Sequence, residues 1–362
     1  MSNSHKTIFV GMSGGVDSSV TAHLLKEQGY DVVGIFMRCY NIDGCAEADA
    51  EDARRVAEHI GIPFYVWDFE QEYKDRVVQY MIEGYRAGIT PNPDVMCNRE
   101  IKFGLFLEKA LASGADFVAT GHYVKLEKSL EGVFKLFEAT DPNKDQSYFL
   151  WTLGQKQLAH CLFPIGSIKK PEVREIARRA GLLTAEKKDS QGICFLGKFS
   201  LDDFLKQYIP EHRGALLTTS GEKIGEHSGV EFYTIGQRHI DADFVFPKTG
   251  GAVERKPLYV ASKDPGTNTV MLAEGQDDPA LYRSEIELTQ INIISGIPED
   301  ATPVSVCARV RYRQPLSGAT LSKLNEGKYK LVFSTPQKFV AEGQSVVFYS
   351  AKGEMLGGGI IL

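Results

Sequence analysis

The chain has 362 residues, more than one ordinary hydrophobic core requires, so we expect two or three domains. Its 43% hydrophobic and 24% charged residues are typical of a soluble globular protein. The formal net charge of −6 gives no general attraction for nucleic acid, so any polyanion would need a local basic patch. No apolar run approaches the ~20 residues that cross a bilayer, and residues 1–6 are too few for a signal peptide. We expect a cytoplasmic protein without membrane contact.

The first half of the chain alternates short runs rich in Val, Ile and Phe with helical patterns that end at glycines. Such runs predict buried strands, and glycine suits the position just after a helix. Alternating strands and helices predict an α/β domain with a doubly wound parallel sheet. The predicted strands are 7–12, 31–38, 62–69 and 116–120, and the predicted helices are 18–28, 46–60, 98–113 and 169–182.

Three segments far apart in the sequence lie at the ends of predicted strands: 13–19, 37–39 and 121–123. In doubly wound sheets, ligands bind beyond the carboxyl ends of the strands. We therefore expect these segments to converge in space.

Beyond residue 210 the helical periodicity disappears, and short strands alternate with glycine turns. This pattern predicts β-barrel or sandwich modules. Within the first half, 124–126 and 133–139 flank a turn and predict a hairpin insertion. We predict an α/β domain over 1–210, a small β-rich domain over 211–282 and a terminal β-barrel over 283–362.

Residues 13–19, Ser-Gly-Gly-Val-Asp-Ser-Ser, resemble a phosphate-binding loop without its lysine. A Walker A motif fails because Val16 and Asp17 stand where it needs glycine and lysine, and Ser13 breaks the dinucleotide fingerprint. The glycines still let the backbone approach a phosphate, and the following helix directs N–H groups at it. Asp17 would repel that phosphate unless Mg²⁺ lay between them or the carboxylate turned away to order the loop. Simple packing of a strand–helix turn is the alternative interpretation.

The six cysteines include no C-x-x-C pair, which argues against a zinc or Fe–S site. A cytosolic setting argues against permanent disulfides. Cys97 precedes a predicted helix whose N-terminus would lower its thiol pKa, and Asp94 is an acid/base candidate in the same loop. Cys194 lies between glycines and after Lys187 and Lys188, where a thiol can be reached and can move. Buried structural cysteine is the alternative for both, and we assign it to Cys39, Cys45, Cys161 and Cys307.

Six motifs in order along the chain resemble one family. They are GMSGGVDSSV, TPNPDVMCNREIKFG, ATGHY, DQSYFLW, DSQGICFLG and YTIGQRHI, between residues 11 and 240. Together they closely resemble the tRNA-specific 2-thiouridylases, the MnmA family, and S-G-G-x-D-S-S resembles the PP-loop of the ATP pyrophosphatase superfamily. No motif position departs from the family pattern. The resemblance implies a PP-loop α/β domain (adenine nucleotide alpha hydrolase-like) and two smaller β-rich domains, the last a barrel that contacts tRNA.

The resemblance also implies a reaction. In this family the wobble uridine of tRNA (Lys, Glu and Gln acceptors) receives sulfur at C2, after AMP from ATP is transferred to the C2 oxygen and pyrophosphate leaves. Cys194 would carry a persulfide, and Cys97 would attack it, giving freed sulfide or direct transfer and a transient Cys97–Cys194 disulfide. Asp94 would act as acid/base near the target base. A sulfur-relay protein or a cysteine desulfurase would supply the sulfur, no zinc or Fe–S cluster is expected, and we expect a monomer.

Family positions carry over to two sets of binding residues. ATP, with Mg²⁺ possible near Asp17, would contact Gly11, Met12, Ser13, Gly14, Gly15, Val16, Asp17, Ser18, Met37 and Gly121. The target base and tRNA would contact Asn92, Pro93, Asp94, His122, Lys144, Asp145, Gln146, Arg311, Tyr312 and Gln344. His122 could instead be a satisfied histidine beside the sheet.

Two basic stripes give a weaker indication of an RNA surface. Lys170, Arg174 and Arg178 have helical spacing, and Arg309, Arg311 and Arg313 alternate along a predicted strand, so each set would share one face. A tRNA must be held by local positive charge, although such stripes are usually solvated surface.

Two rival functions remain open from the sequence. A PP-loop ligase or amidotransferase would adenylate a small molecule and need neither Cys97, Cys194 nor tRNA. A non-catalytic RNA-binding module with a relic ATP loop would bind tRNA without turning over ATP.

Overall fold

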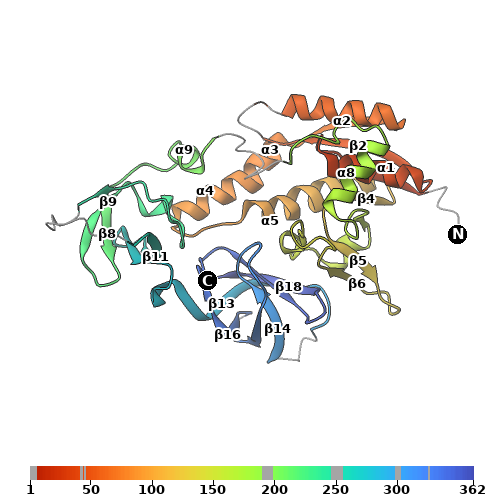
Figure 1. Cartoon of the computed structure of the whole chain (residues 1–362). Helices are drawn as coiled ribbons and strands as arrows, with labels where there is room; N and C mark the ends of the chain where they lie inside the picture. The colour runs from red at the N-terminus through yellow and green to blue at the C-terminus, as the bar shows by residue number, and fades with distance from the viewer. Residues whose placement is uncertain are drawn as a thin grey trace.

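The computed structural model (Figure 1) describes residues 6–40, 44, 46–189, 199–245, 256–297, 303–324 and 327–362. The predictions made for Cys45 and Cys194 lie outside these residues. Figure 1 shows an N-terminal α/β domain above, a small β-rich domain at the left and a barrel below. Within the described ranges, no helix combines the length and apolarity needed to cross a membrane.

A parallel five-stranded sheet forms the centre of the N-terminal domain. Its strands are β1 (Thr7–Gly11), β2 (Asp31–Arg38), β3 (Phe64–Asp68), β4 (Phe117–Thr120) and β7 (Cys161–Leu162), in the order β3-β2-β1-β4-β7. Ile8 and Val10 share a core with α1 (Val16–Glu27), α2 (Ala46–Ile60) and α8 (Lys170–Arg179), whereas Phe9 shares another with Met81 and Phe106. Because alternate side chains of a strand point to opposite faces, the sheet is covered on both sides. The predicted doubly wound sheet is confirmed.

The glycines predicted to end helices adopt a left-handed conformation, which glycine reaches without steric cost. Their φ values are +83° at Gly29, +68° at Gly61, +92° at Gly114 and +66° at Gly181.

The prediction that 62–69 forms a buried strand is wrong in one respect. β3 is an edge strand whose Tyr65 and Val66 are 57% and 48% exposed, because nothing described covers that part of the edge.

Two long helical segments cover the second face of the sheet. The first joins α3 (Glu70–Tyr73), the π-helix η1 (Lys74–Val78) and α4 (Gln79–Arg86); the second joins α5 (Pro93–Cys97), the π-helix η2 (Asn98–Leu105) and α6 (Phe106–Ala112). The sequence prediction started the second helix after Cys97, which is wrong. Asn92 caps α5 by accepting a hydrogen bond from the Val95 N–H at 3.2 Å, and Pro93 takes the first helical position, where its fixed φ is favourable.

The small central domain is a five-stranded sheet with the order β10-β9-β8-β12-β11. Its strands are β8 (Gly214–Thr218), β9 (Lys223–His227), β10 (Asp243–Phe244), β11 (Leu258–Asp264) and β12 (Thr269–Glu274). Before it, α7 (Gln155–Leu158) and α9 (Leu201–Leu205) are short helices that the sequence analysis did not predict.

The terminal domain is a closed six-stranded barrel. Its strands are β13 (Tyr282–Ile293), β14 (Val304–Arg309), β15 (Ser317–Lys323), β16 (Tyr329–Lys338), β17 (Ser345–Tyr349) and β18 (Glu354–Ile361), and pairing of β13 with β18 closes it. Leu288, Leu321 and Phe348 are fully buried in its interior. The predicted barrel is confirmed, and closure leaves no unpaired barrel edge.

The predicted hairpin insertion is confirmed as β5 (Lys125–Lys128) and β6 (Phe134–Phe137). It does not extend the sheet of its own domain, because β6 pairs with β18 of the barrel, with Leu136 opposite Met355. Tyr148 and Trp151 strengthen this junction by donating to the carbonyl and the hydroxyl oxygen of Ser345, at 2.8 and 3.0 Å. The barrel is therefore fixed directly to the N-terminal domain.

Candidate active site

The phosphate-type loop is a strand-to-helix turn held by its own serines. Gly14 has a φ of +72°, and a Cβ there would lie 2.3 Å from the Asp49 carbonyl oxygen, so only glycine fits. Ser18 Oγ accepts from the Ser13 N–H and donates to the Gly15 carbonyl, both at 3.1 Å. α1 begins at Val16, two residues before the predicted start, so Asp17 lies in its first turn. The first-turn N–H groups lack helical acceptors and can bind an anion.

The three strand ends converge as predicted. Gly11 pairs with Ile35 of β2 and with Thr120 of β4. A Cβ on Gly11 would lie 3.0 Å from Met37 Cε, and one on Gly121 would lie 2.8 Å from the Ser18 nitrogen. The residues predicted to contact ATP therefore surround one edge of the sheet, and their contact with ATP stays a prediction.

The cation missing from the loop is supplied by α8. Lys170 is only 7% exposed, and its Nζ donates to both carboxylate oxygens of Asp17, at 2.7 and 2.8 Å. The Tyr123 hydroxyl donates to the same carboxylate at 2.7 Å, and burial, reinforced by the charge of Asp17, raises the Tyr123 pKa. Asp17 is thus turned away from the loop opening to order the loop, one of the two arrangements that the sequence left open.

A second carboxylate, Asp189, connects the loop to a residue predicted to contact tRNA. Its oxygens accept from Lys144 at 2.5 Å, from Lys170 at 2.8 Å and from Arg174 at 2.8 Å. In the basic stripe Lys170, Arg174 and Arg178, the first two side chains pair with carboxylates of the protein, and contact of the stripe with RNA stays a prediction. Sequence reasoning missed Lys170 as the partner of Asp17, since helical spacing reveals a shared face but not what that face covers.

Lys187, one of the two lysines that precede Cys194 in the sequence, pairs with Asp49 at 2.7 Å and with Asp52 at 2.6 Å on α2. Its charge is thus engaged by two carboxylates. Lys187 and Asp189 together hold the chain preceding residue 190 against α2 and α8.

Asp94 and Cys97 lie on one short helix, α5, and Asp94, not Cys97, lies at the N-terminus of that helix. Cys97 lies one turn inside the helix and is 7% exposed, so the prediction that a helix N-terminus acts on its thiol is wrong. Asp94 is the residue in the first turn. Burial raises the pKa of Asp94, although the positive charge of Lys102 opposes that shift. A carboxylate with a raised pKa suits an acid/base role.

His122 lies beside this helix as a buried, neutral ring. Burial, followed by the charge of Lys102, lowers the His122 pKa well below its usual value. Its Nδ1 is 2.8 Å from the Thr120 hydroxyl, and its ring packs 5.7 Å from that of Phe103 in η2. His122 has a partner at Nδ1, so the structure also fits the satisfied-histidine alternative. Because Lys102 acts on both His122 and Asp94, the end of β4 and the predicted target-base loop form one neighbourhood.

Residues of the barrel domain contact the loop before α5 and the short helix Ser147–Leu150. Gln344 donates to the carbonyls of Thr90 and Pro91, at 3.0 and 3.1 Å, immediately before Asn92. The ring of Tyr312 packs 4.5 Å from that of Phe149. The barrel thus supports the backbone from which Asp94 and Cys97 project.

Other predicted tRNA contacts are engaged within the protein. Gln146 Oε1 accepts from the Tyr123 N–H at 3.0 Å, and Asp145 is 4% exposed with its oxygens bonded to Ala139 and Ser147. The half-buried guanidinium of Arg311 donates to the carbonyl of Ile235, and burial lowers its pKa. These residues brace the site, and their contact with tRNA stays a prediction.

Among the described residues, no group of three His, Cys, Asp or Glu side chains could hold a metal ion. The Asp17 carboxylate, the predicted neighbour of Mg²⁺, is already occupied by Lys170 and Tyr123. Mg²⁺ stays an expectation tied to the ATP that it would accompany.

Three family models match consecutive parts of the chain: a tRNA methyl transferase HUP domain over residues 6–198, a tRNA methyl transferase PRC-barrel domain over 202–274 and an aminomethyltransferase beta-barrel domain over 283–361. A tRNA-specific 2-thiouridylase of Streptococcus thermophilus is 46% identical, with 99% of this chain and 96% of that protein covered. The chain belongs to the tRNA-specific 2-thiouridylase family. A second 2-thiouridylase, from Geobacillus thermodenitrificans, is 48% identical over 99% of this chain and 95% of its own length.

A solved 4-thiouridine synthetase, described as an RNA complex with bound ATP, shares 16% identity at a TM-score of 0.35, covering 56% of this chain and 50% of its own. That likeness is too low to carry an inference about this 2-thiouridylase-family chain.

Proposed function

We propose that the chain is an ATP-dependent tRNA sulfurtransferase that converts the wobble uridine to 2-thiouridine and releases AMP and pyrophosphate. Its full-length similarity to 2-thiouridylases supports tRNA thiolation. The observation that carries the mechanism is the neutralised PP-loop, with Asp17 held by Lys170 at 2.7 Å, at the strand edge shared with His122. Such a loop leaves its backbone N–H groups available to a pyrophosphate leaving group.

The first step would be transfer of AMP to the base. The C2 oxygen of uracil attacks the α-phosphorus of ATP, the bond to the β-phosphate oxygen breaks, and the N3 proton must leave. Asp94 accepts that proton, because its carboxylate lies in the first turn of α5 and its pKa is raised. The loop N–H groups stabilise the departing pyrophosphate, and the C2 oxygen becomes part of a phosphate ester that can leave.

The second step would bring sulfur. In one route the terminal sulfur of a Cys194 persulfide attacks C2 and expels AMP, and the Cys97 thiolate then attacks the Cys194 sulfur. The disulfide Cys97–Cys194 forms and 2-thiouridine is released. In the other route Cys97 attacks first and frees sulfide, which attacks C2. Both routes balance, and both need an external thiol to reduce the disulfide before the next cycle.

The remaining proposals concern setting and partners. Sulfur would arrive from a relay protein or a cysteine desulfurase, and the substrates would be tRNAs for Lys, Glu and Gln. We propose a cytoplasmic monomer with domains over 1–210, 211–282 and 283–362.

One assay tests the proposal against its rivals. The purified full chain is incubated with ATP, a persulfide as sulfur donor, a thiol reductant and unmodified tRNA; AMP is quantified and nucleosides are identified by mass spectrometry. We expect 2-thiouridine and AMP in equal amounts, dependent on tRNA. AMP formed without tRNA would instead indicate a small-molecule ligase, and tRNA binding without AMP would indicate a non-catalytic module.

Asp94→Asn should raise thermal stability at neutral pH and lower AMP transfer at least about 100-fold, because asparagine cannot accept the N3 proton. A raised carboxyl pKa means that the folded chain binds the proton more tightly than the unfolded chain, so ionised Asp94 costs stability. The stability gain should shrink as pH falls through the raised pKa. It should vanish below the unfolded value of about 3.9, where both states are protonated.

Thermal melts at several pH values and single-turnover AMP assays check this expectation. Asp75→Asn, on the exposed side of η1, is the control and should change neither quantity. Wild-type AMP transfer in Asp94→Asn would remove Asp94 from the role of base.

A further inference from the structure

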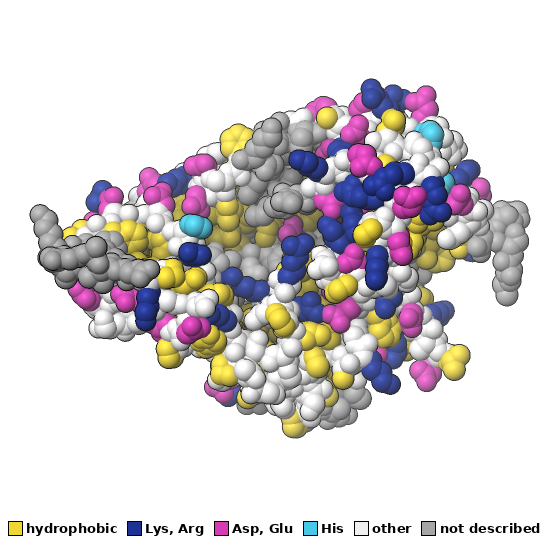
Figure 2. Space-filling model, in the orientation of Figure 1, with side chains coloured by type: hydrophobic (Ala, Val, Ile, Leu, Met, Phe, Trp, Pro, Cys, Tyr) yellow, Lys and Arg dark blue, Asp and Glu magenta, His cyan; other side chains and the backbone are white. Residues whose placement is uncertain are grey.

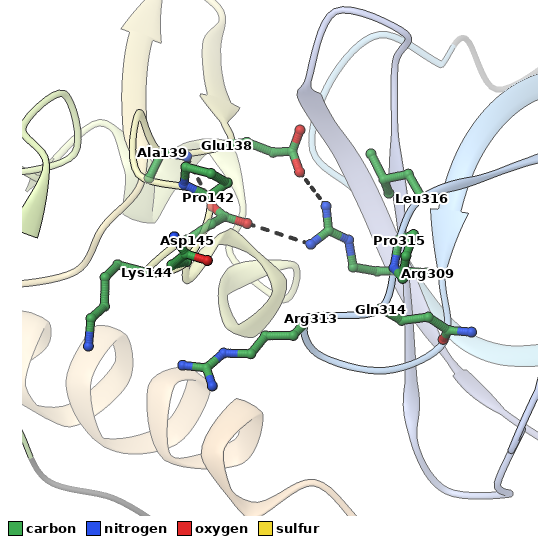
Figure 3. Close-up of a pocket in the computed structure, with 11 residues that line it drawn as sticks. Glu138, Ala139, Pro142, Lys144, Asp145, Arg309, Arg313, Gln314, Pro315 and Leu316 are labelled. Carbon is green, nitrogen blue, oxygen red and sulfur yellow. Dashed lines mark hydrogen bonds and ion pairs between the residues drawn. The ribbon is translucent and has the colours of Figure 1, made fainter.

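The half-buried carboxylates of this protein differ in whether a hydrogen-bond donor meets them. Figure 2 shows Lys and Arg side chains around the hollow between the N-terminal domain and the barrel. In the cavity at that junction, Glu138 and Asp145 both face Arg309 (Figure 3). The carboxylate of Asp94 is different, because within the described ranges no group donates a hydrogen bond to it. A carboxylate withdrawn from water without a donor is costly.

Asn98, one helical turn after Asp94, holds a second oxygen without a donor. Its side chain is 3% exposed, and among the described residues its buried Oδ1 has no hydrogen-bond partner. Its Nδ2 donates to the Phe149 carbonyl at 3.4 Å, and because a carbonyl can only accept, the amide oxygen is the atom left without a partner. A buried acceptor without a donor costs stability, and such an atom in a native fold needs a reason.

The side chains of Asp94 and Asn98 share one face of a helix. The Asn98 N–H donates to the Asp94 carbonyl, so the backbone between the two residues has α-helical geometry. Side chains four residues apart on a helix are neighbours, with Cβ atoms about 5–6 Å apart, and amide–carboxyl hydrogen bonds form at this spacing. While Asp94 is ionised, both side chains present acceptors to each other. A proton on Asp94 turns the pair into a donor and an acceptor.

We propose that Asn98 is a positioning residue for the proposed base: its Oδ1 accepts a hydrogen bond from the Asp94 carboxyl after Asp94 takes the N3 proton of the uracil. The N3–H bond breaks, and its electron pair forms the C2=N3 double bond as the C2 oxygen bonds to phosphorus. The proton is then held between the two side chains. Because 2-thiouridine carries a proton at N3, the same proton returns to N3 when sulfur replaces the oxygen. This inference rests on the proposed function, because it takes Asp94 as the base.

The charges around Asp94 leave this role to Asn98. Burial raises the Asp94 pKa, and Lys102 of η2 opposes that shift, whereas an acceptor that bonds only the protonated carboxyl raises the pKa further. Cys97 shares α5 with Asp94. Ionisable groups of the neighbouring elements are neutral or paired elsewhere. They include Tyr80 of α4, Tyr148 of the helix Ser147–Leu150, His122 after β4, Arg76 of η1, and Arg99 and Glu100 of η2.

Asn98→Leu tests the inference, because leucine has nearly the shape of asparagine but no acceptor. AMP transfer should rise with pH as Asp94 ionises, and the midpoint of that rise should move about one pH unit lower in the variant. The plateau rate should fall about threefold to tenfold, because Asp94 becomes a weaker base. The readout is single-turnover AMP formation at saturating ATP and tRNA over a pH series.

Asn98→Asp is the sharper variant, because it should move the midpoint in the opposite direction. Two neighbouring carboxyl groups share one proton, since both cannot ionise easily, and their upper apparent pKa rises. The midpoint should therefore move at least about one pH unit higher. Thr152→Val is the control, because it removes another buried oxygen without a partner, on a residue outside α5. Its midpoint should match that of wild type.

A measurement without tRNA separates this inference from the proposed function. NMR of protein labelled at its aspartate carboxyl carbons follows the titration of Asp94, which Asp94→Asn assigns. The titration midpoint should move lower in Asn98→Leu and higher in Asn98→Asp, as the activity midpoint does. The melting temperature of Asn98→Leu at neutral pH should stay equal or rise, because a buried oxygen without a donor is removed.

An Asp94 titration that stays in place in Asn98→Asp would overturn the inference, and so would shifts in the same direction in both variants. If Asn98→Leu does not fold, the upward shift in Asn98→Asp still decides. An activity midpoint that stays while the NMR midpoint moves would show that Asn98 tunes a carboxyl that is not the base, which also overturns the inference. The proposed function fails separately: titrations that move as expected in a protein that forms no AMP with tRNA would refute thiolation and leave the Asp94–Asn98 pair standing.

Discussion

Cys97→Ser should lower 2-thiouridine formation more than about 1000-fold, while AMP transfer to tRNA in a single turnover stays close to wild type. The nucleophile is a thiolate, and a serine hydroxyl at the same buried position is far less nucleophilic at neutral pH. In the proposed mechanism, AMP transfer depends on the loop and on Asp94, which precedes Cys97 by one helical turn. If Cys97 first frees sulfide, the variant should accumulate adenylated tRNA; if the persulfide attacks C2 first, it should accumulate tRNA joined to Cys194 through a sulfur–sulfur bond. Mass spectrometry of nuclease digests separates the two outcomes. Cys194→Ser, chosen on the strength of the motif resemblance, should accumulate adenylated tRNA in either route.

Cys161→Ser is the matched control. Cys161 is 2% exposed, donates from Sγ to the Gln157 carbonyl at 3.1 Å and has its pKa raised by burial, so it stays a thiol. Serine can keep that hydrogen bond, and thiolation should persist. Full thiolation by Cys97→Ser would defeat the persulfide mechanism, and failure of both AMP transfer and thiolation would show that the substitution damages the helix rather than the chemistry.

Local chemistry made much of the fold predictable. Compact runs of Val and Ile flanked by glycines located four strands of the sheet, and glycines such as Gly29 and Gly181 marked helix ends through their positive φ. The start of α5 was missed because two prolines suggested a stiff loop. Pro93 instead occupies the first helical position, with Asn92 as its cap. β7 has only two residues, too few to show the alternating hydrophobic pattern by which strands are predicted, so the sequence analysis missed it.

The site was predictable only where its residues are neighbours in sequence. The loop and the Asn92–Cys97 helix each carry their residues in one motif. Lys170 reaches Asp17 across 153 positions, and only the packing of α8 on α1 brings them together. The strand predicted from the alternation of Arg309, Arg311 and Arg313 was wrong past its first member, because β14 ends at Arg309 and residues 311–314 form a turn.

Lys170→Met should lower AMP transfer about 100-fold or more. Its ammonium is the cation that neutralises Asp17, in the first turn of the helix that follows the loop proposed to accept a polyphosphate. Without it, two carboxylates, Asp17 and Asp189, would repel the incoming charge, and loss of one preorganised group at such a site costs about 100- to 1000-fold. The chain should still fold, because Tyr123 still donates to Asp17 and Arg174 still pairs with Asp189. Single-turnover AMP formation and thermal melts measure both effects.

Two comparisons decide whether Lys170 acts through Asp17. Arg174→Met, one turn further along α8, removes a cation that touches Asp189 but not Asp17, and should leave AMP transfer within about threefold of wild type. In Asp17→Asn/Lys170→Met the charges are removed together. When two residues act as a unit, replacing either one already removes their joint effect, and replacing both removes nothing more. The AMP-transfer activity of this double variant should therefore be at least that of the less active of the two single variants. Losses that multiply would instead mean that Lys170 works independently of Asp17, and the neutralised loop would no longer explain how the site accepts a pyrophosphate leaving group without a lysine of its own.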